Sequence, residues 1–146
     1  MKRTLFAAIL AAAAGLVPAI AAADTIDLSA GYLGTRGGDS AGTGIVTFQG
    51  PRFGPFGAQV SGMFPFAGGG THFAATAEGV FHAPGGAYLG AGLGVGRLSL
   101  PLQTGMLYDV VGGVPVFPHL DVVARYYSGT SRAAGQGIFG GLELRL

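Results

Sequence analysis

The feature that most constrains this chain is a strict alternation of side chains near its C-terminal end. In the segment 120–127, every second residue is apolar, and an aspartate and an arginine lie between them. Because side chains two positions apart share one face of a β-strand, this pattern predicts a strand with one apolar and one polar face. The apolar face carries Leu120, Val122, Ala124 and Tyr126, and the opposite face carries Asp121, Val123, Arg125 and Tyr127.

Similar segments, separated by turn residues, recur along the chain. The connections after the second, fourth and sixth segments are tight and rich in proline and glycine, whereas the others are looser and more polar. An even number of strands joined alternately by short turns and longer loops is typical of a transmembrane barrel. The sequence therefore predicts an all-β fold, an eight-stranded antiparallel up-and-down transmembrane β-barrel. Its predicted strands are residues 25–34, 43–49, 57–66, 71–83, 87–98, 104–116, 120–127 and 136–146, and the facing of the second is left open.

The ionisable residues decide which face is the interior. Only 10% of the chain is charged, against about 25–35% for the surface of a soluble small domain. A barrel with its apolar face inside would therefore have too few charges for a water-facing surface. We expect lipid on the apolar face and a lumen in which Asp27 approaches Arg145 and Arg125 reaches Glu78 or Asp109. The predicted lumen network comprises Asp27, Glu78, Asp109, Asp121, Arg125, Glu143 and Arg145.

The N-terminal segment 1–23 resembles a signal peptide, with a basic start, an apolar run and a small-residue end. The expected domains are thus the cleavable signal peptide, 1–23, and the barrel, 24–146. Without Lys2 and Arg3, six basic residues face seven acidic ones, which argues against nucleic-acid binding. The chain has no cysteine, so neither disulfides nor thiolate metal sites are available.

Aromatic residues and glycines also follow the barrel pattern. Gly90, Gly92, Gly94 and Gly96 fall on one predicted inner face and would leave room for long side chains opposite. Aromatic residues gather at strand ends, as membrane interfaces favour. The predicted belts contain Tyr32, Phe64, Phe66, Phe73, Phe81, Phe117 and Tyr126.

The last third of the chain supports a family resemblance. "GGVPVFPHLDVVARYYSG", 112–129, followed by "GQGIFGGLELRL", 135–146, resembles the closing strands of small outer-membrane barrels similar to the OmpA transmembrane domain and OmpX. The resemblance implies a place in the outer membrane and contact with its lipid and its assembly machinery. In that family the machinery reads a terminal strand that usually ends in Phe, and here the matching positions are Leu142, Leu144 and Leu146.

The leading functional hypothesis is a small integral outer-membrane protein with a structural or surface-interaction role. Both termini would be periplasmic, and the outer loops would bind any surface partner. One alternative is a soluble exported barrel that holds an apolar ligand, as a lipocalin does; another is a lipid A-modifying enzyme. Such an enzyme needs a histidine beside a serine, and no histidine is near Ser128 or Ser131 in sequence. We therefore predict no enzymatic activity and no cofactor. His72 and His82, about 33 Å apart along an extended strand, are not expected to share a metal.

Overall fold

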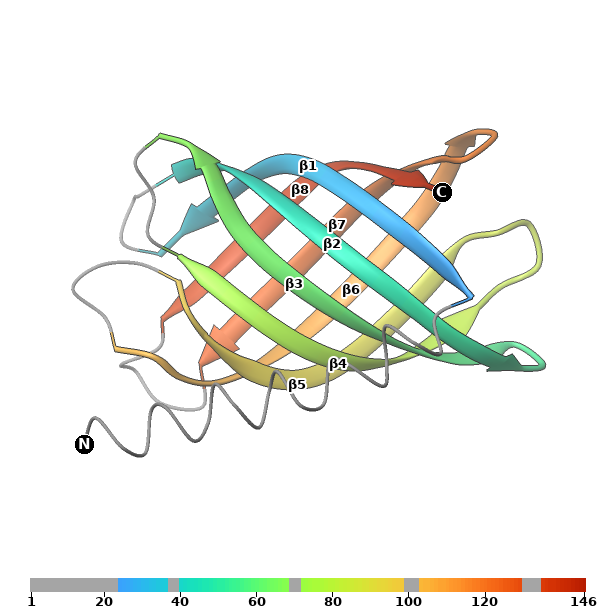
Figure 1. Ribbon diagram of the computed structural model, residues 1–146, viewed down its shortest axis with the longest axis horizontal. Helices are drawn as coiled ribbons and strands as arrows, with labels where there is room; N and C mark the ends of the chain where they lie inside the picture. The colour runs from blue at the N-terminus through green and yellow to red at the C-terminus, as the bar shows by residue number, and fades with distance from the viewer. Residues whose placement is uncertain (1–23, 37–39, 69–71, 99–102, 130–134) are drawn as a thin grey trace.

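The computed structural model describes residues 24–36, 40–68, 72–98, 103–129 and 135–146. They form a closed barrel in which each strand pairs antiparallel with its neighbours in sequence and the last pairs with the first (Figure 1). This confirms the predicted fold class. The predicted signal peptide, 1–23, lies outside the described residues. The strands are β1 (Thr25–Thr35), β2 (Ser40–Phe53), β3 (Phe56–Ala67), β4 (Phe73–His82), β5 (Tyr88–Arg97), β6 (Gly105–Phe117), β7 (Leu120–Gly129) and β8 (Gln136–Arg145). Within the described ranges, no helix is long and apolar enough to cross a membrane.

The two tightest turns close one end of the barrel. Gly54 and Pro55 join β2 to β3, and Pro118 and His119 join β6 to β7. Gly54 and His119 both have a φ of 64°, a left-handed conformation that glycine adopts freely and that histidine tolerates better than bulky residues do. We call this the turn end, and the opposite end the loop end. The tight connections after β2, β4 and β6 were predicted.

Strand β2 is longer than the sequence indicated. The predicted strand covered 43–49, but β2 continues through the expected turn to Phe53, with a register shift between Gln49 and Arg52. Such a bulge accommodates Pro51, which cannot donate a ladder hydrogen bond. At its other end β2 begins at Ser40, inside the predicted loop. The open question of its facing is also answered, because alternate residues Ala41, Thr43, Ile45, Thr47 and Gln49 are buried inside.

The assignment of the faces is confirmed around the barrel. Arg125 is only 1% exposed, whereas its neighbours in β7, Val122 and Tyr126, are 47% and 37% exposed. The interior therefore holds the polar face, and the outside carries the apolar one. Large apolar side chains on the outside include Ile26, Leu28, Tyr32, Leu89, Leu93, Met106, Val110, Val114, Val122, Ile138, Leu142 and Leu144.

The inward glycines of β5 leave room for a long side chain, as predicted, because a Cβ at Gly92 would lie 2.6 Å from Glu78 Cγ. They also leave room for backbone. A Cβ added at Gly94 would lie 2.0 Å from the carbonyl oxygen of Ala75, and one at Gly92 would lie 2.3 Å from that of Ala77. The backbone of β4 therefore occupies the space that a side chain on β5 would need. Glycine at these positions permits the close approach of the β4 backbone.

Candidate functional site

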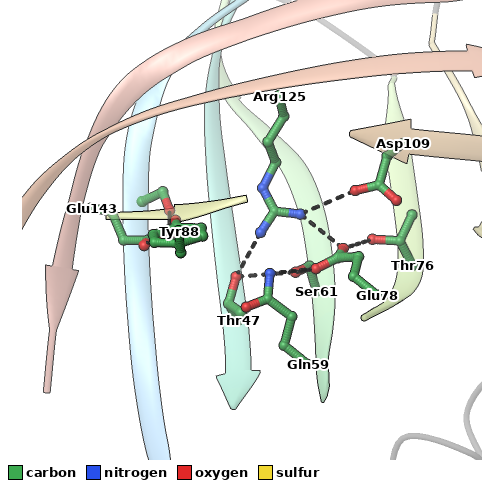
Figure 2. A network of polar contacts seen from close by, with 10 residues as sticks. Thr47, Gln59, Ser61, Thr76, Glu78, Tyr88, Asp109, Arg125 and Glu143 are labelled. Carbon is green, nitrogen blue, oxygen red and sulfur yellow. Dashed lines mark hydrogen bonds and ion pairs between the residues drawn. The ribbon is translucent and has the colours of Figure 1, made fainter. Parts of the chain in front are cut away.

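Arg125 lies at the centre of the lumen and joins four strands. Its Nη1 donates to Glu78 Oε1 of β4 at 2.8 Å and to Asp109 Oδ2 of β6 at 3.4 Å. Its Nη2 donates to Thr47 Oγ1 of β2 at 3.2 Å (Figure 2). The side chains of all three charged residues are inaccessible to solvent. Arg125 thus contacts both of the carboxylates that the sequence offered as its partners.

Neutral side chains complete the coordination of Glu78. Gln59 Nε2 and Ser61 Oγ donate to its Oε2, at 2.5 and 3.1 Å, and Thr76 donates to its Oε1. Figure 2 shows these groups converging on the carboxylate from β3 and β4. A buried carboxylate is tolerated when its oxygens are paired and hydrogen-bonded in this way. The central cluster, comprising Arg125, Glu78, Asp109, Thr47, Gln59, Ser61 and Thr76, therefore acts as a polar plug.

Arg145 pairs with a different acid from the predicted one. Asp27 and Arg145 are register partners on β1 and β8, as expected of a closed barrel. However, Arg145 Nη2 donates to Asp121 of β7 at 2.5 Å, and Asp27 instead accepts from Gln49. The expected approach of Asp27 to Arg145 is present in the register, and the ion pair that Arg145 makes is with Asp121. Arg145 of β8 lies between β1 and β7, and the Oδ2 of Asp27 already accepts from the amide of Gln49.

Glu143 is held by two hydroxyl groups from opposite directions. Ser29 Oγ of β1 donates to its Oε2 at 2.9 Å, and the hydroxyl of Tyr88 on β5 donates to its Oε1 at 2.6 Å. The Tyr88 ring also covers Gly113, where an added Cβ would lie 2.2 Å from the ring. A tyrosine thus crosses the lumen above a glycine and fixes a carboxylate on the far wall.

Buried apolar residues fill the lumen toward the loop end. Leu33, Leu98 and Leu107, each at most 1% exposed, come from strand ends next to the longer connections. Beside them, His72 Nε2 lies 2.8 Å from Thr43 Oγ1, and burial lowers the pKa of His72. The lumen is therefore sealed by side chains at this end as well as at its centre.

The residues considered for chemistry do not form a reactive site in the described part of the chain. Ser128 is buried and accepts from Gln136 Nε2 at 3.3 Å, while His72 contacts Thr43 and His119 lies in the turn after β6. Ser131 is outside the described residues. Among the described residues, no group of three or more acidic, histidine or cysteine side chains could hold a metal ion.

The predicted belt residues lie on the outer wall near the strand ends. At the turn end, the rings of Phe56 and Phe81 stand 5.5 Å apart; on the wall, those of Tyr108 and Tyr126 stand 6.4 Å apart. Of the predicted belts, Tyr32, Phe64, Phe66, Phe81, Phe117 and Tyr126 are exposed, and Phe73 is partly exposed beneath the guanidinium of Arg97. The predicted assembly signal, Leu142, Leu144 and Leu146, is also exposed outside. A role in lipid anchoring or assembly stays a prediction for both sets.

Comparison with known proteins gives structural neighbours. No protein-family model matches the chain, and no curated protein sequence matches it. Among solved structures, the Neisserial surface protein A (NspA) is similar, with a TM-score of 0.58 and 18% identity over 84% of this chain and 94% of that one. The Yersinia pestis outer membrane protein Ail, determined in a phospholipid bilayer nanodisc, has a TM-score of 0.60 and 15% identity over 84% of this chain and 99% of that one. At these identities the comparison shows a common fold, the barrel fold of outer-membrane proteins.

Proposed function

We propose that this protein is a small integral outer-membrane barrel with a structural or surface-interaction role. The observation that carries the proposal is the separation of the polar and apolar side chains onto the inner and outer faces of the barrel wall. Large apolar side chains are exposed on the outside of the wall, while Arg125 and the acidic residues of the strands are buried inside it. Lipid on that outside satisfies the apolar side chains, and the closed sheet leaves no unpaired backbone for the hydrocarbon to cover. The fold shared with proteins named for the outer membrane and the surface supports this proposal.

The same interior argues for anchoring rather than transport. Arg125 and the side chains of Tyr127, Phe139 and Leu107 are at most 1% exposed. An eight-stranded barrel is just wide enough for side chains to fill, and here they do so. We therefore assign the barrel no conducting pore and no interior ligand. This ordering of the faces is the reverse of that in a soluble lipocalin-like barrel, and so weighs against that alternative.

The orientation and partners follow from the two ends. We place the turn end and both termini in the periplasm and the longer connections outside, since short turns face the periplasm in this class. The lipid-facing wall is the contact with outer-membrane lipid, and the terminal leucines are where the assembly machinery would read the chain. A surface partner would bind the loop end. With Ser128 buried and hydrogen-bonded to an amide, we propose no enzymatic role.

Membrane fractionation combined with a heat-shift gel tests this proposal. We expect the protein in the detergent-extractable membrane fraction, with unboiled and boiled samples migrating differently because a closed barrel resists unfolding. A matched pair of variants sharpens the test. Val122→Asp, on the exposed outer wall, should abolish stable insertion, whereas Ser40→Asp, exposed at the loop end, should have no effect. Recovery of the parent protein in the aqueous fraction would refute the proposal.

A further inference from the structure

The outer wall carries a groove that the general barrel pattern does not require. It crosses β2, β3 and β4 toward the turn end and has a volume of about 410 Å³. Its lining is mainly apolar. Gln59 and Glu78 also belong to the lining, but their side chains form a hydrogen bond with each other inside the barrel.

The groove exists because small residues occupy one row of the wall. Gly50 of β2 lies against Ala58 of β3, Ala58 pairs with Gly79 of β4, and Gly79 pairs with Ala91 of β5. All four point outward, and we call them the small-residue row. Bulkier residues flank it on the turn-end side, where Phe56, Phe81 and Leu89 lie. On the loop-end side it is flanked by Phe48, Val60 and Leu93, with the small residue Ala77 of β4 between Val60 and Leu93.

The dimensions of the row exclude a second copy of the chain as its occupant. Four adjacent strands span about 14 Å, and the flanking rows lie about 13 Å apart along the strands. The enclosed area is therefore about 180 Å², far below the roughly 800 Å² per partner of a stable protein interface.

We propose that the groove binds one acyl chain of a membrane lipid. This inference rests on the proposed function, because it requires the outer wall to face hydrocarbon. The groove lies in that wall, and its lining offers few polar groups to a headgroup. An unfilled groove in hydrocarbon loses dispersion contacts on its floor, and a flexible chain restores them. The occupant is thus a lipid tail from the leaflet at the turn end, held longer than the tails around the rest of the wall.

Two glycines provide a matched pair of variants. A Cβ added at Gly79 or at Gly140 meets no atom within 4 Å, so both positions accept leucine without moving the backbone. Gly79 is in the small-residue row, whereas Gly140 points outward from β8, away from the groove. Gly79→Leu fills the groove and Gly140→Leu adds the same bulk elsewhere. Ala58→Leu in the row and Ala124→Leu on β7 form a second pair, should the first fold poorly.

Photo-crosslinking measures the occupancy of the groove. The full chain is reconstituted in vesicles of phosphatidylethanolamine and phosphatidylglycerol that contain a phospholipid with a diazirine in its acyl chain. After illumination, mass spectrometry locates the modified residues. We expect several-fold more modification along 48–60 and 77–79 than on β7 and β8. Gly79→Leu should reduce it to the level of β7 and β8, and Gly140→Leu should leave it unchanged.

The contrary outcomes separate this inference from the proposed function. Uniform modification around the wall, or enrichment that Gly79→Leu does not reduce, would overturn the groove site and leave the membrane assignment intact. If outward residues anywhere on the wall react no more than a water-exposed residue such as Ser40, the proposed function itself fails.

Discussion

Removal of the Arg125 guanidinium is the most informative perturbation of the lumen. Arg125→Met keeps a side chain of similar length but leaves Glu78 and Asp109 without their shared cation. Removing one partner of a buried ion pair costs about 3–5 kcal/mol. Two hydrogen bonds to charged groups, at about 1.5–3 kcal/mol each, give a similar figure. Such a loss is a large share of the 5–15 kcal/mol that is typical of whole proteins.

Urea titration of the barrel in phospholipid vesicles measures this cost. The folded fraction at each concentration is read from the unboiled band on a gel, and the free energy of unfolding comes from linear extrapolation. The double variant Arg125→Met/Glu78→Gln should recover part of the loss, because it removes one uncompensated carboxylate. Arg145→Met should cost less, because that side chain is 30% exposed and water screens its charge. The reasoning is refuted if Arg125→Met unfolds at the same urea concentration as the parent. It is also refuted if adding Glu78→Gln to Arg125→Met lowers the free energy of unfolding further.

Three further predictions use the same unfolding assay. Gly94→Ala should cost about 1–3 kcal/mol, because its Cβ meets the backbone of β4. Gly62→Ala, whose Cβ meets no atom within 4 Å, should be close to neutral, and equal effects would contradict the close approach of β4 to Gly94. Tyr88→Phe should cost about 1.5–3 kcal/mol, because Glu143 loses a buried donor, and an unchanged midpoint would show that this hydrogen bond contributes little. Because burial lowers the pKa of His72, the free energy of unfolding should fall as the pH drops below about 6.5, by at most about 1.4 kcal/mol per pH unit. His72→Gln should remove this pH dependence, and a pH dependence that persists in the variant would belong to other groups.

The facing of seven strands could be predicted because their side chains alternate between two kinds of face, and in five of them the charged residues also fall on the inner face. In β7, Asp121 and Arg125 fall on one face and Val122 on the other, so a slip of one residue would expose both charges to hydrocarbon. Strand β2 lacks that information. Ile45 faces inward and Val46 outward, and no ionisable residue lies between Ser40 and Gln49 to distinguish the faces.

The charged residues of the lumen could be predicted from the sequence, but the neutral side chains that hydrogen-bond to them could not. A buried arginine requires carboxylates, so Glu78 and Asp109 could be assigned to Arg125 from strand order alone. Gln59 and Tyr88 carry no charge that demands a partner. The register brings Gln59 to Glu78, and Tyr88 reaches Glu143 across the lumen. The choice of Asp121 over Asp27 by Arg145 depends on side-chain geometry, which alternation does not contain.

The account depends on hydrocarbon lying against the outer wall of the barrel, and spin labels test this most directly. The chain has no cysteine, so single variants Val122→Cys, Leu142→Cys and Ser40→Cys can each be labelled in bilayers. We predict that nitroxides at Val122 and Leu142 are relaxed by oxygen dissolved in lipid, whereas one at Ser40 is relaxed by a water-soluble nickel chelate. Relaxation of the Val122 and Leu142 labels by the chelate, in a barrel that still shows its heat shift, would contradict the central claim.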